Sequence, residues 1–325
     1  MGRRVLHGYD RGNASSDIEA RAAHLREQSG FRPSLAGYCR AMSATPPFGW
    51  PVYKMFDQIG RYTICYMLIH NHYAWLHEGG PVPTLTTLQA VSGASERQTA
   101  GLIAALKSGR LVHADVSADD RRVRHLRPSP AMIAEIGRSM RLFIAAVDEA
   151  APAPAASRAL MLMNDIDMLG DVIRRSAAYV LEHGNLLYPF PRILNFARRD
   201  CGYLLLTAIF AAYYSTGTDG APNEWQLSCR HLAQRFQVSA AHVGNLMSEA
   251  GREGLFSTGN QGRLIAMDSG FAAEFEQWAS WQMVFYSNLA DAALEYRSQK
   301  QALLCRTPDI LMESEHAAWK EKPLL

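Results

Sequence analysis

The residues best suited to bind an anion lie in one short stretch, Asp120 to Arg127, where four of eight positions are arginine. If this stretch forms a strand, alternate residues share a face, so Arg122 and Arg124 project to the same side and Arg121 lies nearer the tip. Guanidinium groups placed in this way bind phosphates or enter the minor groove of DNA. The alternative is a solvated hairpin in which Asp120 and the arginines form ion pairs.

A capped helix precedes this stretch. Ser95-Glu96-Arg97-Gln98 has the sequence of a capping box, in which the Ser95 hydroxyl accepts from the backbone N–H of Gln98 and the Gln98 side chain reaches back. The first residues of a helix that starts in this way can contact DNA. The alternative is an ordinary surface helix with the same cap. The candidate contact residues are Ser95, Glu96, Arg97, Thr99 and Ala100.

Both features belong to a segment that the chain contains twice. Residues 84–112 align without a gap with residues 228–256. Each copy reads as a capped helix, a turn, a Ser-capped second helix and a β-prone pair, which is the order of a helix-turn-helix followed by a wing. In the second copy the candidate DNA contacts are Ser239, His242, Asn245 and Arg263.

The second copy is the poorer reader of DNA. Its Ser-capped helix begins without Arg or Lys, and its short wing carries only Arg263. Two interpretations remain open. Either the first copy dominates an asymmetric contact with DNA, or the second copy is a structural or partner-binding module.

These features resemble the multiple-antibiotic-resistance regulator (MarR) family. The matching residues are Leu85-Thr86-Thr87-Leu88, the Ser-capped helix that leads to Leu111-Val112, and Asp120-Arg121-Arg122 in the wing. The chain departs from the family in having Gly101 where a basic residue is common, and Arg110 where glycine usually precedes the Leu-Val pair. The resemblance implies a fused pseudo-dimer that binds double-stranded DNA and a small aromatic or apolar effector, with flanking helices as the dimer interface.

The chain has room for two domains, with 325 residues of which 48% are hydrophobic and 20% charged. A net charge of +2 neither supports nor excludes a nucleic-acid partner. We expect a mainly α fold with two small β-wings, in which tandem winged helix-turn-helix domains pack as an intramolecular pseudo-dimer through long flanking helices. The predicted parts are a leader with a short helix (1–47), the first repeat (48–150), a Pro/Ala linker and connecting helix (151–187), the second repeat with C-terminal helices (188–304) and a tail (305–325).

Several classes of site find no support in the sequence. No nucleophile–base set, glycine-rich phosphate loop or carboxylate pair is present, and the five cysteines form no Cys-x-x-Cys pair. His70, His72 and His77 are better explained as helix histidines than as metal ligands, and Cys65 and Cys201 as buried thiols rather than redox sensors. The apolar stretch 204–214 is too short to span a bilayer. We therefore expect a cytoplasmic protein that is not an enzyme, with no cofactor, no metal and no membrane partner.

The function that this sequence favours is a DNA-binding transcriptional regulator. It would contact two unequal half-sites about one helical turn apart. The alternative is an adaptor or ligand sensor that does not bind DNA and uses the same pseudo-dimer for protein–protein interaction.

Overall fold

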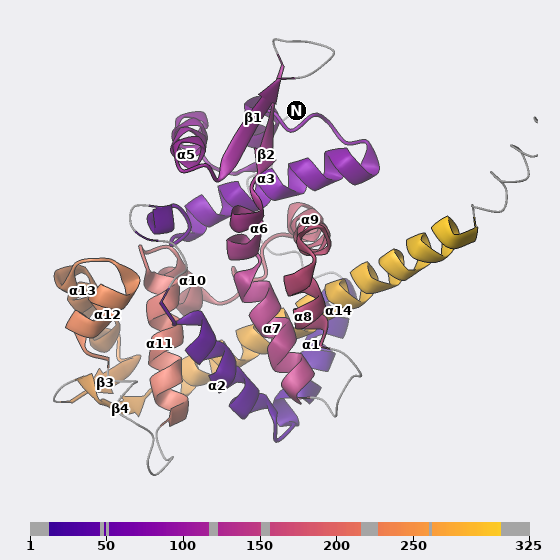
Figure 1. The fold of residues 1–325 in the computed structure, drawn as a ribbon. Coiled ribbons are helices and arrows are strands. Elements are labelled where there is room, and N and C mark those ends of the chain that lie inside the picture. Colours follow the sequence, from indigo (N-terminus) through magenta and orange to yellow (C-terminus); the bar gives the residue numbers. More distant parts are fainter. Residues whose placement is uncertain are drawn as a thin grey trace, which may run out of the picture.

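The computed structural model describes residues 13–45, 49, 52–116, 123–150, 157–215, 227–259 and 262–306 (Figure 1). The described chain is mainly helical and carries two small antiparallel hairpins. The elements up to residue 150 are α1 (Asn13–Glu27), α2 (Phe31–Met42), the 3-10 helix η1 (Val52–Met55), α3 (Ile59–Glu78), α4 (Leu85–Val91), α5 (Glu96–Ser108), β1 (Val112–Val116), β2 (Arg124–Pro128), α6 (Pro130–Ile136) and α7 (Arg138–Ala150). The later elements are α8 (Arg158–Asn164), α9 (Ile166–His183), α10 (Pro191–Ala197), α11 (Gly202–Ser215), α12 (Cys229–Phe236), α13 (Ala240–Arg252), β3 (Phe256–Thr258), β4 (Leu264–Met267) and α14 (Ser269–Arg306).

Each copy of the repeated segment contains two short helices and a hairpin in the predicted order. The first unit is α4, α5, β1 and β2, and the second is α12, α13, β3 and β4. Hydroxyl caps begin α4, α5 and α13, because each cap oxygen accepts a backbone N–H that has no partner within the helix. In the first hairpin, Val112 pairs with Pro128 and Val116 pairs with Arg124.

Two hydrophobic cores support the two units. The first core joins α3, the first unit and α9, and includes Leu88, Ile103 and Leu106. The second joins α10, α11 and the second unit to α1, α2 and the N-terminal part of α14. The predicted leader thus supplies two helices to the core of the second unit, although it lies at the other end of the chain.

The helices that flank the units exchange places. Helix α2 precedes the first unit but packs on α11 of the second half, and α9 precedes the second unit but packs on α3 of the first half. Similarly, α1 packs on α14 while α8 packs on α7, and α7 and α14 pack on each other. These contacts are reciprocal, as they are between the subunits of a two-fold dimer.

Two of the helical stretches that flank the units are interrupted. The stretch after the first hairpin is divided into α6 and α7 at Gly137, where a Cβ would lie 2.7 Å from Leu169. The predicted connecting helix within 151–187 is divided into α8 and α9 at Asp165, whose carboxylate caps α9. At the C-terminal end of the second repeat, the structure has the single helix α14. Of the predicted Pro/Ala linker, residues 151–156 lie outside the described residues, as do residues 117–122 between the two strands of the first hairpin.

Within the described ranges, no helix combines the length and apolar character needed to cross a bilayer. The apolar stretch 204–214 lies in α11, whose residues from Leu204 to Ala212 are all buried in the second core.

Candidate nucleic-acid interface

The N-terminus of α5 is held in place by the predicted capping box. The backbone N–H of Gln98 donates to the Ser95 hydroxyl over 3.2 Å, and the backbone N–H of Ser95 donates to Gln98 Oε1 over 3.2 Å. Ser95, Glu96 and Arg97 are exposed and Ala100 is half-buried. The first turn of α5 is therefore both rigid and accessible.

The prediction for Thr99 is wrong. We expected its side chain to reach DNA, but in the structure Thr99 is completely buried. Its hydroxyl donates to the carbonyl of Ser95 over 3.1 Å and lies 3.1 Å from the hydroxyl of Ser92. Thr99 thus fastens the turn between α4 and α5. A threonine in the second turn of a helix can face either the solvent or the protein interior. Here the packing of α4 on α5 places Thr99 in the interior.

Arg124 extends the accessible basic surface onto the first hairpin. It is exposed and forms no ion pair with a described residue, whereas Arg127 donates to Asp115 over 2.9 Å. The hydrogen bond from Arg127 lowers the pKa of Asp115, and nearby His125 acts in the same direction. Asp115 thus braces the base of the hairpin. Arg121 and Arg122 lie outside the described residues.

The second unit places its candidate residues less favourably. Ser239 caps α13 through the backbone N–H of His242 at 3.1 Å, and Asn245 and Arg263 are exposed. His242 was expected to reach DNA, but its Nε2 lies 3.0 Å from the backbone carbonyl of Asp200, to which it donates. The ring therefore ties α13 to the segment before α11, which removes that nitrogen from the surface available to DNA.

Four accessible cations were not among the predicted contacts: Lys107, Arg110, Arg230 and Arg252. Like the predicted Arg97, Arg124 and Arg263, they form no ion pair with a residue in the described part of the chain. The carboxylates are fewer: Asp115 and Glu249 each pair with an arginine, which leaves Glu96 and Glu253. The sequence shows these charges but not their partners, so it could not separate free cations from neutralised ones.

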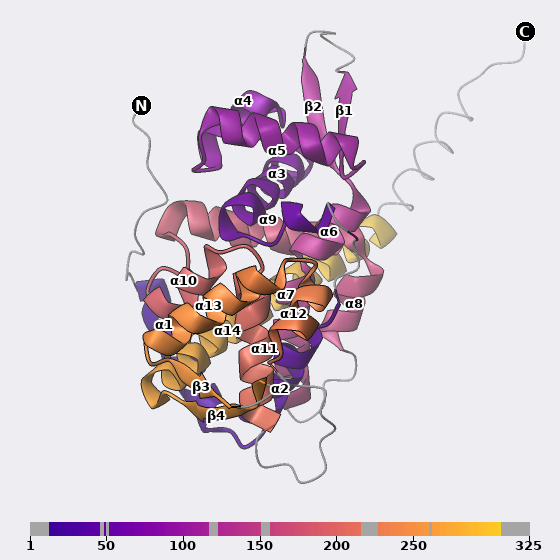
Figure 2. The same cartoon turned by 90° about the vertical axis from the view of Figure 1, so that its left-hand side faces the viewer.

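The two units present α5 and α13 on the same side of the molecule. This side faces the viewer in Figure 2, where the hairpin β1–β2 lies at the top and β3–β4 at the bottom. The same two helices lie on the left in Figure 1. One extended ligand could therefore contact both units at once.

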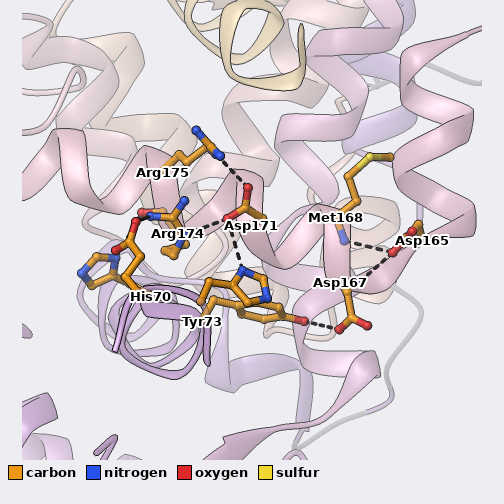
Figure 3. A network of polar contacts seen from close by, with 10 residues as sticks. His70, Tyr73, Asp165, Asp167, Met168, Asp171, Arg174 and Arg175 are labelled. Atoms are coloured by element: carbon orange, nitrogen blue, oxygen red, sulfur yellow. Dashed lines mark hydrogen bonds and ion pairs between the residues drawn. The ribbon is translucent and has the colours of Figure 1, made fainter. Parts of the chain in front are cut away.

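A polar network fixes α3, which supports the first unit, to α9 (Figure 3). Tyr73 donates to Asp167 over 2.8 Å, and Asp171 accepts from Arg174 at 2.8 Å and Arg175 at 2.7 Å. Arg174 also pairs with Glu78 of α3. Because Tyr73, Asp171 and Arg174 are buried, the network specifies one relative position of the two helices.

The three helix histidines have separate surroundings. His70 Nδ1 lies 3.1 Å from the carbonyl of Arg174, and His77 Nδ1 lies 3.6 Å from Asp171. His72 is buried and its Nδ1 has no hydrogen-bond partner among the described residues. No cluster of three or more potential metal ligands occurs in the part of the chain that the structure describes.

His72 is expected to make stability depend on pH. Burial, helped by nearby Arg127 and His125, lowers its pKa to about 4, below the value of about 6.5 in an unfolded chain. Between these two pH values His72 is protonated in the unfolded chain but neutral in the folded one. The free energy of unfolding therefore has its full value above pH 6.5 and decreases as the pH falls toward 4. The loss from this one group is about 3 kcal/mol.

The measurement is the free energy of unfolding in urea between pH 7 and pH 4.5. His72→Phe keeps a ring of similar size, so its stability is expected to fall less steeply than that of the wild type. Parallel pH profiles for the two proteins would contradict the assignment to His72.

A cavity of about 180 Å³ lies where the two cores meet. Helices α3, α7, α9, α11 and α14 supply its walls, which are mainly apolar and aromatic. Tyr62, Tyr203 and Tyr286 line it and are each half-buried, and Trp278 contributes an indole whose Nε1 is buried without a hydrogen-bond partner among the described residues. A cavity of about 150 Å³ is enough for benzene, so this one can hold a molecule of one or two rings.

The two cysteines on α3 and next to α11 are poor nucleophiles. Burial raises the pKa of Cys65, and burial together with Asp57 and Asp200 raises the pKa of Cys201 to about 12. Both thiols therefore stay protonated at neutral pH.

Comparisons with protein-family models, with curated proteins and with solved structures found no match to this chain.

Proposed function

We propose that the protein is a DNA-binding transcriptional regulator in which the two units are winged helix-turn-helix readers of one duplex. The observation that carries this proposal is that α5 and α13 lie on one side, on units whose unpaired cations outnumber their unpaired carboxylates. DNA affinity arises largely from cations that neutralise phosphates. An α-helix with an accessible first turn is the element that fits the major groove.

The exchanged flanking helices support the pseudo-dimer on which this proposal depends. Because α2 and α9 each pack on the other half, neither unit can turn away without opening both cores. The spacing of the two readers is then fixed, as it is in a two-fold dimer bound to two half-sites. The half-sites are unequal, because His242 is held by Asp200 while Arg97 is free.

Arg110 gives independent support. It follows α5 with a φ of 57°, in the left-handed region that favours glycine. Its side chain is exposed and makes no ion pair with a described residue. Glycine at this position would relieve about 1 kcal/mol of backbone strain. A contact of the guanidinium group with DNA would explain why the residue is arginine.

Arg110→Gly is therefore expected to unfold at a higher urea concentration and yet bind DNA more weakly, by about tenfold. Gln237→Gly is the matched control, because Gln237 also adopts a left-handed φ, of 55°, at the end of α12. It should gain stability without losing affinity. If Arg110→Gly binds DNA as tightly as the wild type, Arg110 is not a contact.

The direct test is a selection from random double-stranded oligonucleotides with the full-length protein, followed by affinity measurement at several salt concentrations. We expect a selected site with one stronger and one weaker half, and a steep loss of affinity with salt. If no duplex is enriched and none is bound at about 50 mM salt, the adaptor interpretation replaces this one.

We further propose that the cavity between the cores holds a small, mainly apolar effector. Its lining includes Met42 of α2 and Val180 of α9, so an occupant touches both of the helices that fix the spacing of the readers. An aromatic lining with a few polar groups is typical of small-molecule sites.

Val180→Phe, which narrows the cavity from α9, tests this proposal with 1-naphthol as the probe and tryptophan fluorescence as the signal, because Trp278 lies in the wall. We expect the wild type to bind the probe and the variant to bind at least about tenfold more weakly, since the added ring occupies the space. Val82→Phe, at an exposed position that does not line the cavity, is the control. Equal binding by Val180→Phe would exclude this cavity as the site.

A further inference from the structure

The surface between the two readers is formed by two segments that we call the seam, residues 52–61 and 198–201. The helix η1 packs against α5 at one end of the seam. At the other end Arg199 pairs with Glu249 of α13 at 2.5 Å, and the backbone carbonyl of Asp200 accepts a hydrogen bond from His242. The seam is thus a continuous path of contacts from one recognition helix to the other.

The middle of the seam lies on the axis that relates the two halves. Gln58 Nε2 donates to the backbone carbonyl of Arg198 over 3.0 Å. These positions are equivalent in the repeat, because residues 51, 56 and 69 correspond to 191, 196 and 209 with the same offset. A residue contacts its own counterpart only where it lies on or next to a two-fold axis.

Two cations of the seam are left without partners. Arg61 lies between Asp57 and Asp200, with 2.6 Å to each, and so occupies both seam carboxylates. Lys54 and Arg198 form no ion pair with any described residue; Arg198 is exposed and Lys54 is half-buried. Burial raises the pKa of Asp57, and Lys54 is among the charges that oppose this shift, which places Lys54 beside the same cluster.

We propose that the seam is a third DNA contact, in which Lys54 and Arg198 bind phosphates of the backbone between the two half-sites. The inference rests on the proposed function, since it requires a duplex that spans α5 and α13. Phosphates carry one negative charge each, and DNA that follows both readers must cross the axis where Gln58 meets Arg198. Such contacts fix the register of a duplex but do not read its sequence.

The two halves contribute unequally to the seam. The second half has Arg198 where the first has Gln58, and the first half has Lys54 where the second has Leu194, which is buried. The cations therefore come from positions that are not equivalent. They would make the central contact asymmetric, in keeping with unequal half-sites.

The experiment compares the wild type with the double variant Lys54→Gln and Arg198→Gln in full-length protein. Affinity is measured by fluorescence anisotropy on a random-sequence duplex of about 25 base pairs, long enough for two half-sites, and on the selected site. The plot of log affinity against log salt should become shallower by about 1.8, which is two phosphate contacts. The affinity of the double variant should fall by the same factor for both duplexes, because phosphate contacts carry no sequence information.

Arg40→Gln is the matched control, because Arg40 of α2 is also exposed and forms no ion pair with a described residue. It should leave the slope unchanged, and unfolding free energies of all variants should match the wild type. The seam contact would be overturned if the salt slope of the double variant is unchanged, or changes no more than that of Arg40→Gln. It would also be overturned if affinity falls only for the selected site. None of these outcomes would contradict the proposed contacts of α5 and α13 with DNA. Failure of the wild type to bind either duplex would instead overturn the proposed function and this inference with it.

Discussion

Replacing Arg97 and Arg124 together with alanine is expected to lower DNA affinity by about 30- to 100-fold, which corresponds to about 2 to 3 kcal/mol. Arg97 lies in the accessible first turn of α5, and Arg124 lies at the start of β2. Both side chains are exposed and neither has an ion-pair partner among the described residues. The full charge of each is therefore available to a duplex.

The matched variant in the second unit combines Asn245→Ala with Arg263→Ala. These residues are also exposed, but only one of them is charged and the neighbouring His242 is held by Asp200. We expect their replacement to reduce affinity by less than tenfold. Equal losses in the two pairs would show that the readers contribute equally, and no loss in either pair would remove α5 and α13 from the interface.

All four of these substitutions lie on the surface, so the unfolding free energy should change by no more than about 0.5 kcal/mol. Urea unfolding of each variant checks this. An unchanged unfolding free energy would show that a lower affinity results from lost contacts with DNA and not from partial unfolding.

Gly170→Ala is expected to destabilise the fold by about 3 kcal/mol or more. Gly170 lies on α9 directly against Tyr73 of α3, and a Cβ there would lie 2.1 Å from the Cζ atom of the tyrosine ring. Tyr73 cannot move aside easily, because it is buried and its hydroxyl donates to Asp167 over 2.8 Å. The substitution therefore forces α3 and α9 apart, or breaks the polar network between them.

Gly101→Ala is the matched control, since Gly101 lies inside α5 with nothing within 4 Å of an added Cβ. Alanine at an exposed helix position is more favourable than glycine, so this variant should gain about 0.5 to 1 kcal/mol. Unfolding in urea should thus move in opposite directions for the two variants. A small or favourable effect of Gly170→Ala would mean that α9 does not pack on α3 through this contact.

Much of the local structure follows from the sequence alone. Ser95 and Gln98 form the capping box that their types and spacing predict, and Ser239 caps α13 in the same way. Hydroxyl caps are local devices: the groups that they satisfy lie within one turn of the chain. The continuous apolar stretch 204–214 likewise indicates a buried segment, and it lies in the buried helix α11.

Side-chain direction at single positions depended on the neighbouring helix. Thr99 and Arg97 are two positions apart on α5, yet the packing of α4 buries the first and leaves the second exposed. His242 was predicted to face DNA and is instead turned toward the carbonyl of Asp200, which is 42 positions away in the chain. No local pattern encodes either contact.

The sequence by itself determined the two helix–helix–hairpin units, three of their four predicted hydroxyl caps and the excess of arginine in the first unit, because these depend on residues close together in the chain. The exception is Ser228, whose side chain makes no capping hydrogen bond to α12. Only the tertiary structure decided which cations remain free, that α2 packs on α11 and α9 on α3, and that the Gln58 side chain meets the backbone carbonyl of Arg198. Ion pairs such as Arg61 with Asp200 join residues 139 positions apart. Their formation depends on how the two cores pack, and that packing is a property of the whole chain.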